Sequence, residues 1–256
     1  MSIERKKVAV VVTGHLRTYK MHFPHFEKHL LDLHDVDLYL STWDWNHIGV
    51  MAGGTLAKAN EDELIDKLSI YPNVKKVIIS EYKKVNKISE DYINNYGEFG
   101  ICEDPLYKKY IGGKVNRKTM PYNAGQWWPV QEGFNAIENP DQYDVLMRTR
   151  FDIHILKPVR FLPDPIVGCH PGPKRRPGSH LFQTDLYTIK NHVFYGAPDL
   201  IETMKDIYYK NLELTCKFND LATDSLLEYI LRNNLKGHAL TIDEELREGV
   251  EYGVWK

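Results

Sequence analysis

The sequence predicts an α/β fold in which a mostly parallel central sheet is flanked by helices. Short runs rich in β-branched residues alternate with amphipathic segments over residues 1–155, and these runs are apolar throughout, as strands buried on both faces are. A chain of 256 residues can bury a sizeable core in one α/β unit. We therefore expect a single Rossmann-like domain over residues 1–256, with a regular half at about 1–155 and an irregular half at about 156–256.

The regular half opens with a predicted β–α–β unit. Val8–Thr13 is a β-branched run that ends at Gly14, which predicts a buried strand. His22–His34 carries large apolar residues near helical spacing, and Asp37–Thr42 predicts the second strand.

Further helices and strands follow in alternation. Asn60–Ser69 begins with a capping residue and an acidic first turn, so it predicts a helix, and Val74–Ser80 predicts the third strand. Lys83–Thr119 lacks periodicity, which favours a long mobile excursion over a packed element. Gln126–Asn139 then predicts a helix and Asp144–Ile153 a fourth strand.

The second half has a less regular pattern. Pro163–Ser179 is rich in proline, and Asp185–Tyr195 predicts one or two strands. Pro198–Leu212 and Thr223–Asn233 each predict a helix.

Charge and cysteine content disfavour several protein classes. Lys and Arg number 33 against 35 Asp and Glu, a formal net charge of −2, so we expect no nucleic-acid partner and only local phosphate recognition. The three cysteines (Cys102, Cys169 and Cys216) form no C-x-x-C pair, which argues against a disulfide framework or a zinc site. The apolar run after MSIERKK is too short for a signal peptide or a membrane span. These features predict a cytoplasmic protein and leave its oligomeric state open.

Polar residues gather where three predicted strands end, which is where parallel sheets bind ligands. The segments are TGHLRT (13–18), STWD (41–44) and RTRFD (148–152). Their hydroxyls, charges of both signs and aromatic rings suit a nucleotide that carries a diphosphate. The first segment lacks both G-x-G-x-x-G and G-K-[ST], which disfavours a dehydrogenase or an NTPase.

Most of these residues also have a purely structural explanation. Thr13 and Gly14 suit a turn, and Arg17 suits a solvated helix start. Trp43 suits the core because of its area, and Asp44 suits a loop cap.

The charged residues of the fourth strand carry the strongest signal. Period-2 alternation places Arg148, Arg150 and Asp152 on one face of the predicted strand. They could form an internal ion pair at a sheet edge. Alternatively, Asp152 binds a divalent cation that carries a diphosphate, while Arg148 or Arg150 holds the carboxylate or a phosphate oxygen.

Together TGHLRT, STWD and YDVLMRTRFDI (143–153) resemble small nucleotide-sugar glycosyltransferases of the GT-A fold. Similar enzymes occur in large algal viruses and in bacterial surface-polysaccharide clusters. The resemblance covers about residues 8–233, and R-x-R-x-D is its most specific motif. It implies a GT-A-like fold and transfer of a sugar from a nucleotide-diphosphate donor, a uridine one by preference, to a carbohydrate hydroxyl.

The resemblance also implies a set of site residues. Family members carry an Asp-x-Asp whose last aspartate holds Mn²⁺ or Mg²⁺ on the diphosphate, and here Arg150 replaces the first acid. Asp152 is then the candidate metal ligand. In one alternative, Arg150 supplies part of the ion's charge at the diphosphate. In another, Asp152 and His154 together are the metal ligands. The predicted lining of the base and ribose comprises Thr13, Gly14 and Arg17, with Thr42 and Asp44 beside them.

An inverting transfer also needs a base that accepts the acceptor's proton. Asp224 opens a predicted helix and is the first candidate, with helix capping as its alternative explanation. Asp185 and Asp220 are further candidates. Two basic segments, 108–118 and 170–180, could cover the diphosphate or the acceptor, or could be solvated loops.

Two other function classes remain open from the sequence. One is a non-catalytic module that binds a nucleotide-sugar or a carbohydrate, which the missing first aspartate favours. The other is a different nucleotide-dependent transferase, such as a sulfotransferase, although TGHLRT shows no phosphate loop.

Overall fold

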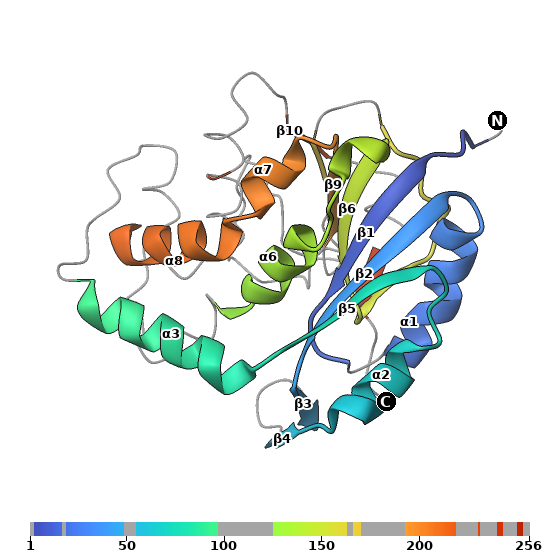
Figure 1. Cartoon of the computed structure of the whole chain (residues 1–256). Coiled ribbons are helices and arrows are strands. Elements are labelled where there is room, and N and C mark those ends of the chain that lie inside the picture. The colour runs from blue at the N-terminus through green and yellow to red at the C-terminus, as the bar shows by residue number, and fades with distance from the viewer. Residues whose placement is uncertain are drawn as a thin grey trace, which may run out of the picture.

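A computed structural model describes residues 3–16, 19–48, 55–96, 125–162, 166–169, 193–218, 230, 240–242 and 250–252. Seven of its strands form one sheet in the order β10-β8-β9-β6-β1-β2-β5 (Figure 1). The parallel strands are β1 (Lys7–Thr13), β2 (Asp35–Trp43), β5 (Val74–Ser80) and β6 (Val145–Arg150). These four strands all come from the first half of the chain.

The second half supplies the other three strands of this sheet. β9 (Val193–Gly196) is antiparallel to both β6 and β8 (Ile166–Cys169), and β10 (Leu240–Ile242) is parallel to β8. Two small antiparallel pairs lie outside the sheet: β3 (Trp45–Ile48) with β4 (Thr55–Lys58), and β7 (Ile153–Ile155) with β11 (Val250–Tyr252).

The strand order reverses between β1 and β6. The chain steps from β1 to β2 to β5 in one direction and then returns to the other side of β1 to form β6. In open α/β sheets such a switch point leaves a crevice at the carboxyl ends of the two strands, and ligands bind there. Thr13, the last residue of β1, pairs with Arg150, the last residue of β6. The topology thus brings two of the sequence-predicted segments to one crevice.

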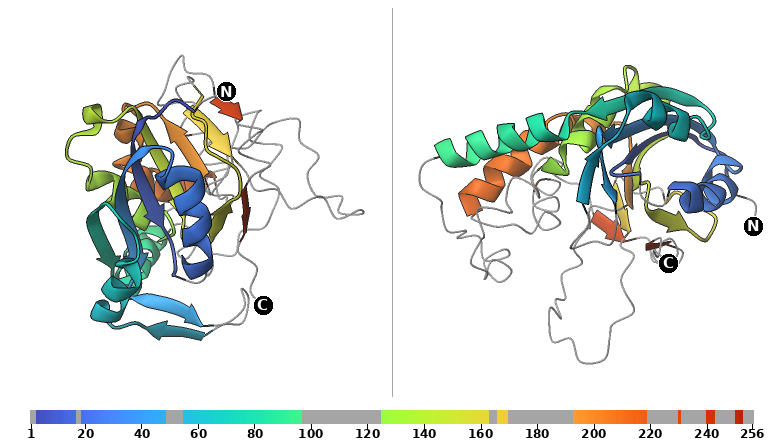
Figure 2. Two further views of the ribbon diagram at one scale, coloured as in Figure 1. Left: turned by 90° about the vertical axis from the view of Figure 1, so that its right-hand side faces the viewer. Right: turned by 90° about the horizontal axis from the view of Figure 1, so that it is seen from below.

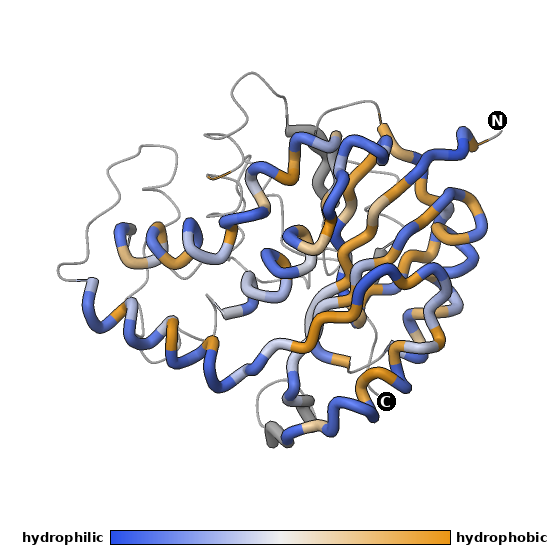
Figure 3. The backbone as a smooth tube through the Cα atoms, viewed as in Figure 1, coloured by the Kyte–Doolittle hydropathy of each residue, from blue (hydrophilic) through white to orange (hydrophobic). Residues whose placement is uncertain are grey.

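Helices cover both faces of the sheet (Figure 2). One face holds α1 (Tyr19–Phe26), its π-helical extension η1 (Glu27–Leu31) and α2 (Glu61–Leu68), which pack on Val8, Val10 and Val12. The other face holds α3 (Tyr82–Asn95), α6 (Trp128–Asn135), α7 (Leu200–Met204) and α8 (Ile207–Phe218). Helix α6 packs directly on β1 and β2, α7 and α8 pack on α6, and α3 packs on α8. Hydrophobic residues accordingly follow the central strands in Figure 3.

These findings confirm the α/β class and much of the element order. β5 spans Val74–Ser80 as predicted, and α2 begins after Asn60, whose side chain accepts a hydrogen bond from the amide of Asp62. None of the helices within the described ranges has the length and hydrophobicity needed to cross a bilayer.

The prediction of an unpacked excursion from Lys83 is wrong for its first part, which belongs to helix α3. The helix buries Val85, Ser89 and Ile93, one residue every four. Ser89 interrupts the apolar pattern, yet its hydroxyl lies 2.8 Å from the buried hydroxyl of Tyr208 on α8. A satisfied polar residue therefore takes a core position and conceals the helical periodicity.

Three predicted boundaries also need correction. The first helix begins at Tyr19, and the helix predicted over Pro198–Leu212 is divided into α7 and α8. The fourth strand ends at Arg150 rather than Ile153, because the chain turns at residues 151–152 before β7. Of Thr223–Asn233 only Ile230 is described, and most of the proline-rich segment lies outside the described residues.

Gly133 permits close packing of α6 on β1. A Cβ atom at this position would overlap Cγ1 of Val11, a stiff β-branched side chain in the core. We expect Gly133→Ala to destabilise the protein by about 1–2 kcal/mol, because overpacking costs about 1–3 kcal/mol and the gain in helix propensity returns only about 0.5–1 kcal/mol. Urea denaturation measures the change. Asn135→Ala on the exposed side of the same helix is the control and should stay within about 0.5 kcal/mol of wild type.

His22 makes stability depend on pH in the acid range. Its ring is fully buried against Phe26, and its Nδ1 lies 3.2 Å from the hydroxyl of Tyr71. Burial, with a smaller contribution from the nearby charge of His154, lowers the pKa of His22 from 6.5 to about 3. Between pH 6.5 and about pH 3 the unfolded chain binds a proton at His22 and the folded chain does not. Protonation therefore favours the unfolded state, and the free energy of unfolding falls as the pH drops from 6.5 toward 3.

We expect His22 to cost about 2 kcal/mol of stability between pH 7 and pH 5, since one proton changes stability by about 1.4 kcal/mol per pH unit. His22→Phe removes the titrating group. Between pH 7 and pH 5 the unfolding free energy of wild type should therefore fall by about 2 kcal/mol more than that of the variant. Urea denaturation at both pH values measures this shift. A difference that is equal at pH 7 and pH 5 contradicts the assignment.

Candidate functional site

A pocket opens at the crevice between β1 and β6. About 650 Å³ of space lies between its walls, open solvent included, so the pocket is an open crevice. The described residues that line it come from the ends of β1, β2 and β6 and from the starts of α3 and α6. They are Thr13, Gly14, His15, Trp43, Tyr82, Gly125, Gln126, Arg148, Arg150 and Asp152.

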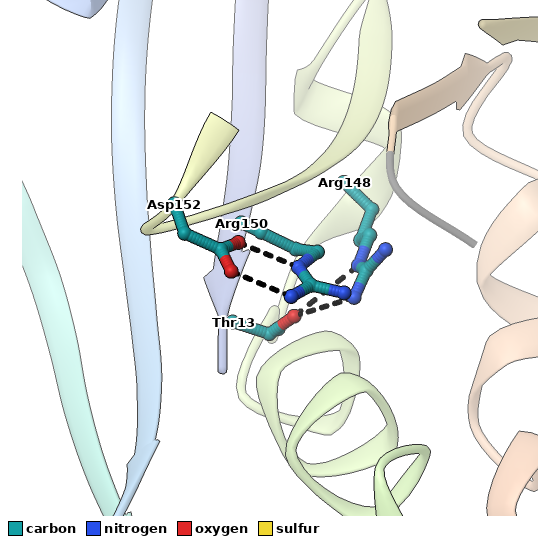
Figure 4. A network of polar contacts seen from close by, with 4 residues as sticks. All are labelled: Thr13, Arg148, Arg150 and Asp152. Carbon is teal, nitrogen blue, oxygen red and sulfur yellow. Dashed lines mark hydrogen bonds and ion pairs between the residues drawn. The ribbon is translucent and has the colours of Figure 1, made fainter. Parts of the chain in front are cut away.

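Arg148 is the buried charge of this pocket, with 4% of its surface exposed. Its Nε and Nη2 atoms donate to the hydroxyl oxygen of Thr13 at 3.2 and 3.0 Å (Figure 4). The contact forms because Thr13 and Arg148 occupy neighbouring strands at the same sheet edge. The sequence segments TGHLRT and RTRFD therefore meet through this contact.

Arg150 and Asp152 form a two-pronged ion pair. Nε and Nη2 of Arg150 donate to Oδ1 and Oδ2 of Asp152, both at 2.7 Å (Figure 4). The two side chains are 22% and 13% exposed, so the pair is half-buried and still lines the pocket. The predicted internal ion pair therefore exists, and it lies in the crevice.

The route by which Asp152 reaches the site differs from the prediction. Asp152 follows the strand instead of continuing its face, because Phe151 turns the chain. Phe151 is fully buried on the α1 side of the sheet, and its amide donates to the carbonyl of Thr13 at 3.3 Å. This anchor places the Asp152 carboxylate beside the guanidinium of Arg150.

Gly14 and Thr42 shape the loop after β1. Gly14 has φ of 108°, a conformation that residues with a Cβ rarely adopt. The hydroxyl of Thr42 donates to the carbonyl of Gly14 at 2.8 Å, and the side chain is fully buried. The structure gives Thr42 a role in holding the loop, and its predicted place beside the ribose stays a prediction.

Asp44 lies at the start of α3. Its Oδ1 accepts a hydrogen bond from the amide of Tyr82 at 2.8 Å, and Tyr82 is the first residue of that helix. A carboxylate there satisfies an amide that has no partner within the helix and complements the helix dipole. Asp44 thus has a capping role, as its structural explanation predicted, although it caps a helix and not a loop. Its contact with a ribose stays a prediction.

The aromatic side chains of His15, Trp43 and Tyr82 form one wall of the pocket. No ligand role was predicted for His15 or Tyr82. His15 lies 6.5 Å from Trp43 and 6.3 Å from Tyr82 between ring centroids, and Trp43 meets Tyr82 edge to face at 5.4 Å. Nδ1 of His15 lies 3.0 Å from the carbonyl of Trp45. Tyr82 was missed because its segment showed no periodicity, whereas His15 stood within the TGHLRT segment already singled out.

His154 takes part in a different contact. It is 5% exposed and stacks on His25 of α1 with 5.3 Å between ring centroids. His154 is not among the described residues that line the pocket. The alternative Asp152–His154 ligand pair receives no support from this placement.

Among the described lining residues, the donor set does not fit a divalent cation. Mg²⁺ and similar ions take several oxygen ligands, often one or two carboxylates with phosphate and water. Within the described residues no group of three or more His, Cys, Asp or Glu side chains is arranged to hold a metal. Both oxygens of Asp152 already accept from Arg150.

Several predicted site residues lie outside the described residues. They are Arg17, Asp185, Asp220 and Asp224, together with the basic segments 108–118 and 170–180. The base for the acceptor hydroxyl therefore stays a prediction.

Comparisons with known proteins add little to this geometry. No protein-family profile and no curated protein matches the chain. Among solved structures, an active-site mutant of LgtC aligns with 92% of this chain and 72% of its own, at 11% sequence identity and a TM-score of 0.44. A similarity of this extent supports no conclusion about the chemistry of the pocket.

Proposed function

We propose that this protein is a glycosyltransferase that takes its sugar from a nucleotide-diphosphate donor, with UDP as the first choice, and passes it to a carbohydrate hydroxyl. The carrying observation is the pocket at the switch point of the sheet, where Thr13, Arg148, Arg150 and Asp152 converge. The planar guanidinium of arginine can donate two parallel hydrogen bonds to phosphate oxygens and carries the opposite charge. The aromatic wall offers apolar surface for the rest of the nucleotide.

In the proposed transfer, the bond between the anomeric carbon and the phosphate oxygen breaks and its electron pair stays on the diphosphate. The acceptor oxygen forms the new bond to the anomeric carbon, and its proton passes to a base. Positive charge beside the leaving diphosphate lowers the barrier because negative charge develops there. Arg148 and Arg150 would supply that charge, and Asp224 or Asp185 remains the proposed base for an inverting reaction.

The resemblance also implies Mn²⁺ or Mg²⁺ on the diphosphate, with Asp152 as its ligand. Since the carboxylate is already paired with Arg150, no step of the proposed transfer depends on the ion. The assay below includes both metals, so a contribution from either is measured directly.

Thermal denaturation with a panel of nucleoside diphosphates, each with EDTA, Mn²⁺ or Mg²⁺, tests the binding half of the proposal. A ligand that binds the folded state raises the melting temperature, and we expect UDP to do so. Release of free UDP from UDP-sugars then tests transfer. Binding without release under any acceptor would favour the non-catalytic nucleotide-sugar module, and no shift with any nucleotide would contradict the proposal.

A further inference from the structure

We propose that the Arg150–Asp152 pair binds the donor's diphosphate without a divalent cation, the Arg150 guanidinium itself supplying the positive charge. This inference rests on the proposed function and assigns the mode of phosphate recognition at the same pocket. Asp152 is then a positioning residue that orients Arg150.

The ion pair fixes the plane of the guanidinium. The pair with Asp152 uses one N–H on Nε and one on Nη2 of Arg150. Both bonds are 2.7 Å long, as in charge-assisted pairs. Because two parallel bonds resist rotation, the Arg150 head is held ready at the pocket edge, which reduces the ordering cost of binding.

The charge of the pocket favours an anion. The described lining residues include two arginines and one aspartate, which leaves one net positive charge when His15 is neutral. Because Asp152 neutralises Arg150, this net charge is that of Arg148, and burial of Arg148 lowers the effective dielectric constant around it. A cation that approached Asp152 would meet the same field with the opposite sign.

The strand geometry brings the second arginine to the same anion. Arg148 and Arg150 are two residues apart on β6, so their side chains leave the same face of the strand. Thr13 holds the head of Arg148 at the end of β1, where it borders the crevice. Two phosphate groups joined through one oxygen require two sites of positive charge close together, and this pair of arginines provides them.

The decisive measurement is the affinity of the full chain for UDP by isothermal titration calorimetry in EDTA, in Mg²⁺ and in Mn²⁺. We expect the dissociation constant in EDTA to lie within about threefold of the values with metal. Affinity that falls tenfold or more in EDTA overturns this inference and leaves the proposed function intact. Absence of UDP binding in all three buffers overturns the proposed function as well.

The variant Arg150→Asp restores the acidic triplet of the family and reverses the expected behaviour. It should bind UDP at least tenfold more weakly than wild type in EDTA and should recover affinity when Mn²⁺ is added. Arg160→Asp, which makes the same charge change at an exposed position, is the matched control and should bind as wild type does. Wild-type affinity of Arg150→Asp in EDTA overturns the inference.

A second variant covers the case in which Arg150→Asp does not fold. Arg150→Gln keeps a polar hydrogen-bond donor on a shorter side chain and removes the charge. It should lower UDP affinity at least tenfold in every buffer and should reduce the dependence of binding on salt. Unchanged affinity and salt dependence would mean that Arg150 serves only the internal ion pair.

Discussion

Arg148→Leu should weaken UDP binding at least about 100-fold while the protein still folds. Arg148 is buried at the carboxyl edge of the switch point, so its charge acts on a ligand with little screening. Loss of one partner of a buried, hydrogen-bonded charge pair typically costs about 2–5 kcal/mol of binding free energy. Calorimetric titration with UDP measures the loss.

The fold should survive this change because a buried charge is expensive in itself. A buried guanidinium carries a large desolvation cost, which the leucine side chain does not incur. The hydroxyl of Thr13 loses the two hydrogen bonds that it accepts from Arg148, a cost of about 1–3 kcal/mol, which thermal denaturation will show. Arg148→Lys retains the charge without the fork, and we expect an intermediate affinity. If Arg148→Leu bound UDP within threefold of wild type, the pocket would not be the phosphate site.

The sequence predicted the four parallel strands β1, β2, β5 and β6 because their signals are local, but it did not predict β8 or β10. β1 is a continuous β-branched run, and α2 has a capping asparagine followed by three acidic residues. These features act within a few residues and need no knowledge of tertiary contacts. The place of β6 beside β1 could not be derived in this way, since only packing decides which strands become neighbours.

The site was predicted in part. Thr13, Gly14, Arg148, Arg150 and Asp152 do line one pocket, as strand-end residues of a parallel sheet should. A helix start brings Tyr82 to the same pocket, and it was missed because Ser89 hides the periodicity of that helix.

The turn after β6 shows a further limit of pattern analysis. Alternating polar and apolar residues continue through Phe151 and Asp152, so the pattern alone describes a longer strand. Whether the chain extends or turns depends on where Phe151 finds its packing partners. The structure places them on the α1 side, among them Tyr71 at 6.2 Å between ring centroids.

Phe151→Ala should destabilise the protein by about 3–5 kcal/mol, the usual cost of truncating a fully buried phenylalanine. Urea denaturation measures this value. Phe151→Leu keeps most of the apolar volume and should cost less than about 1.5 kcal/mol if the neighbours repack. Leu162→Ala, at a side chain that is 38% exposed, is the control for simple loss of apolar surface and should cost less than about 1 kcal/mol.

Binding should respond to Phe151 as well, although its ring faces away from the crevice. The residue stands between Arg150 and Asp152, and its buried ring sets the angle at which the carboxylate returns to the guanidinium. A looser turn lets Arg150 sample other orientations, so folded Phe151→Ala should bind UDP several-fold more weakly, whereas Phe151→Leu should bind nearly as wild type does. Equal affinity in all three proteins at full folding would show that the ion pair keeps its geometry without this anchor, and that Arg150 is oriented by other contacts.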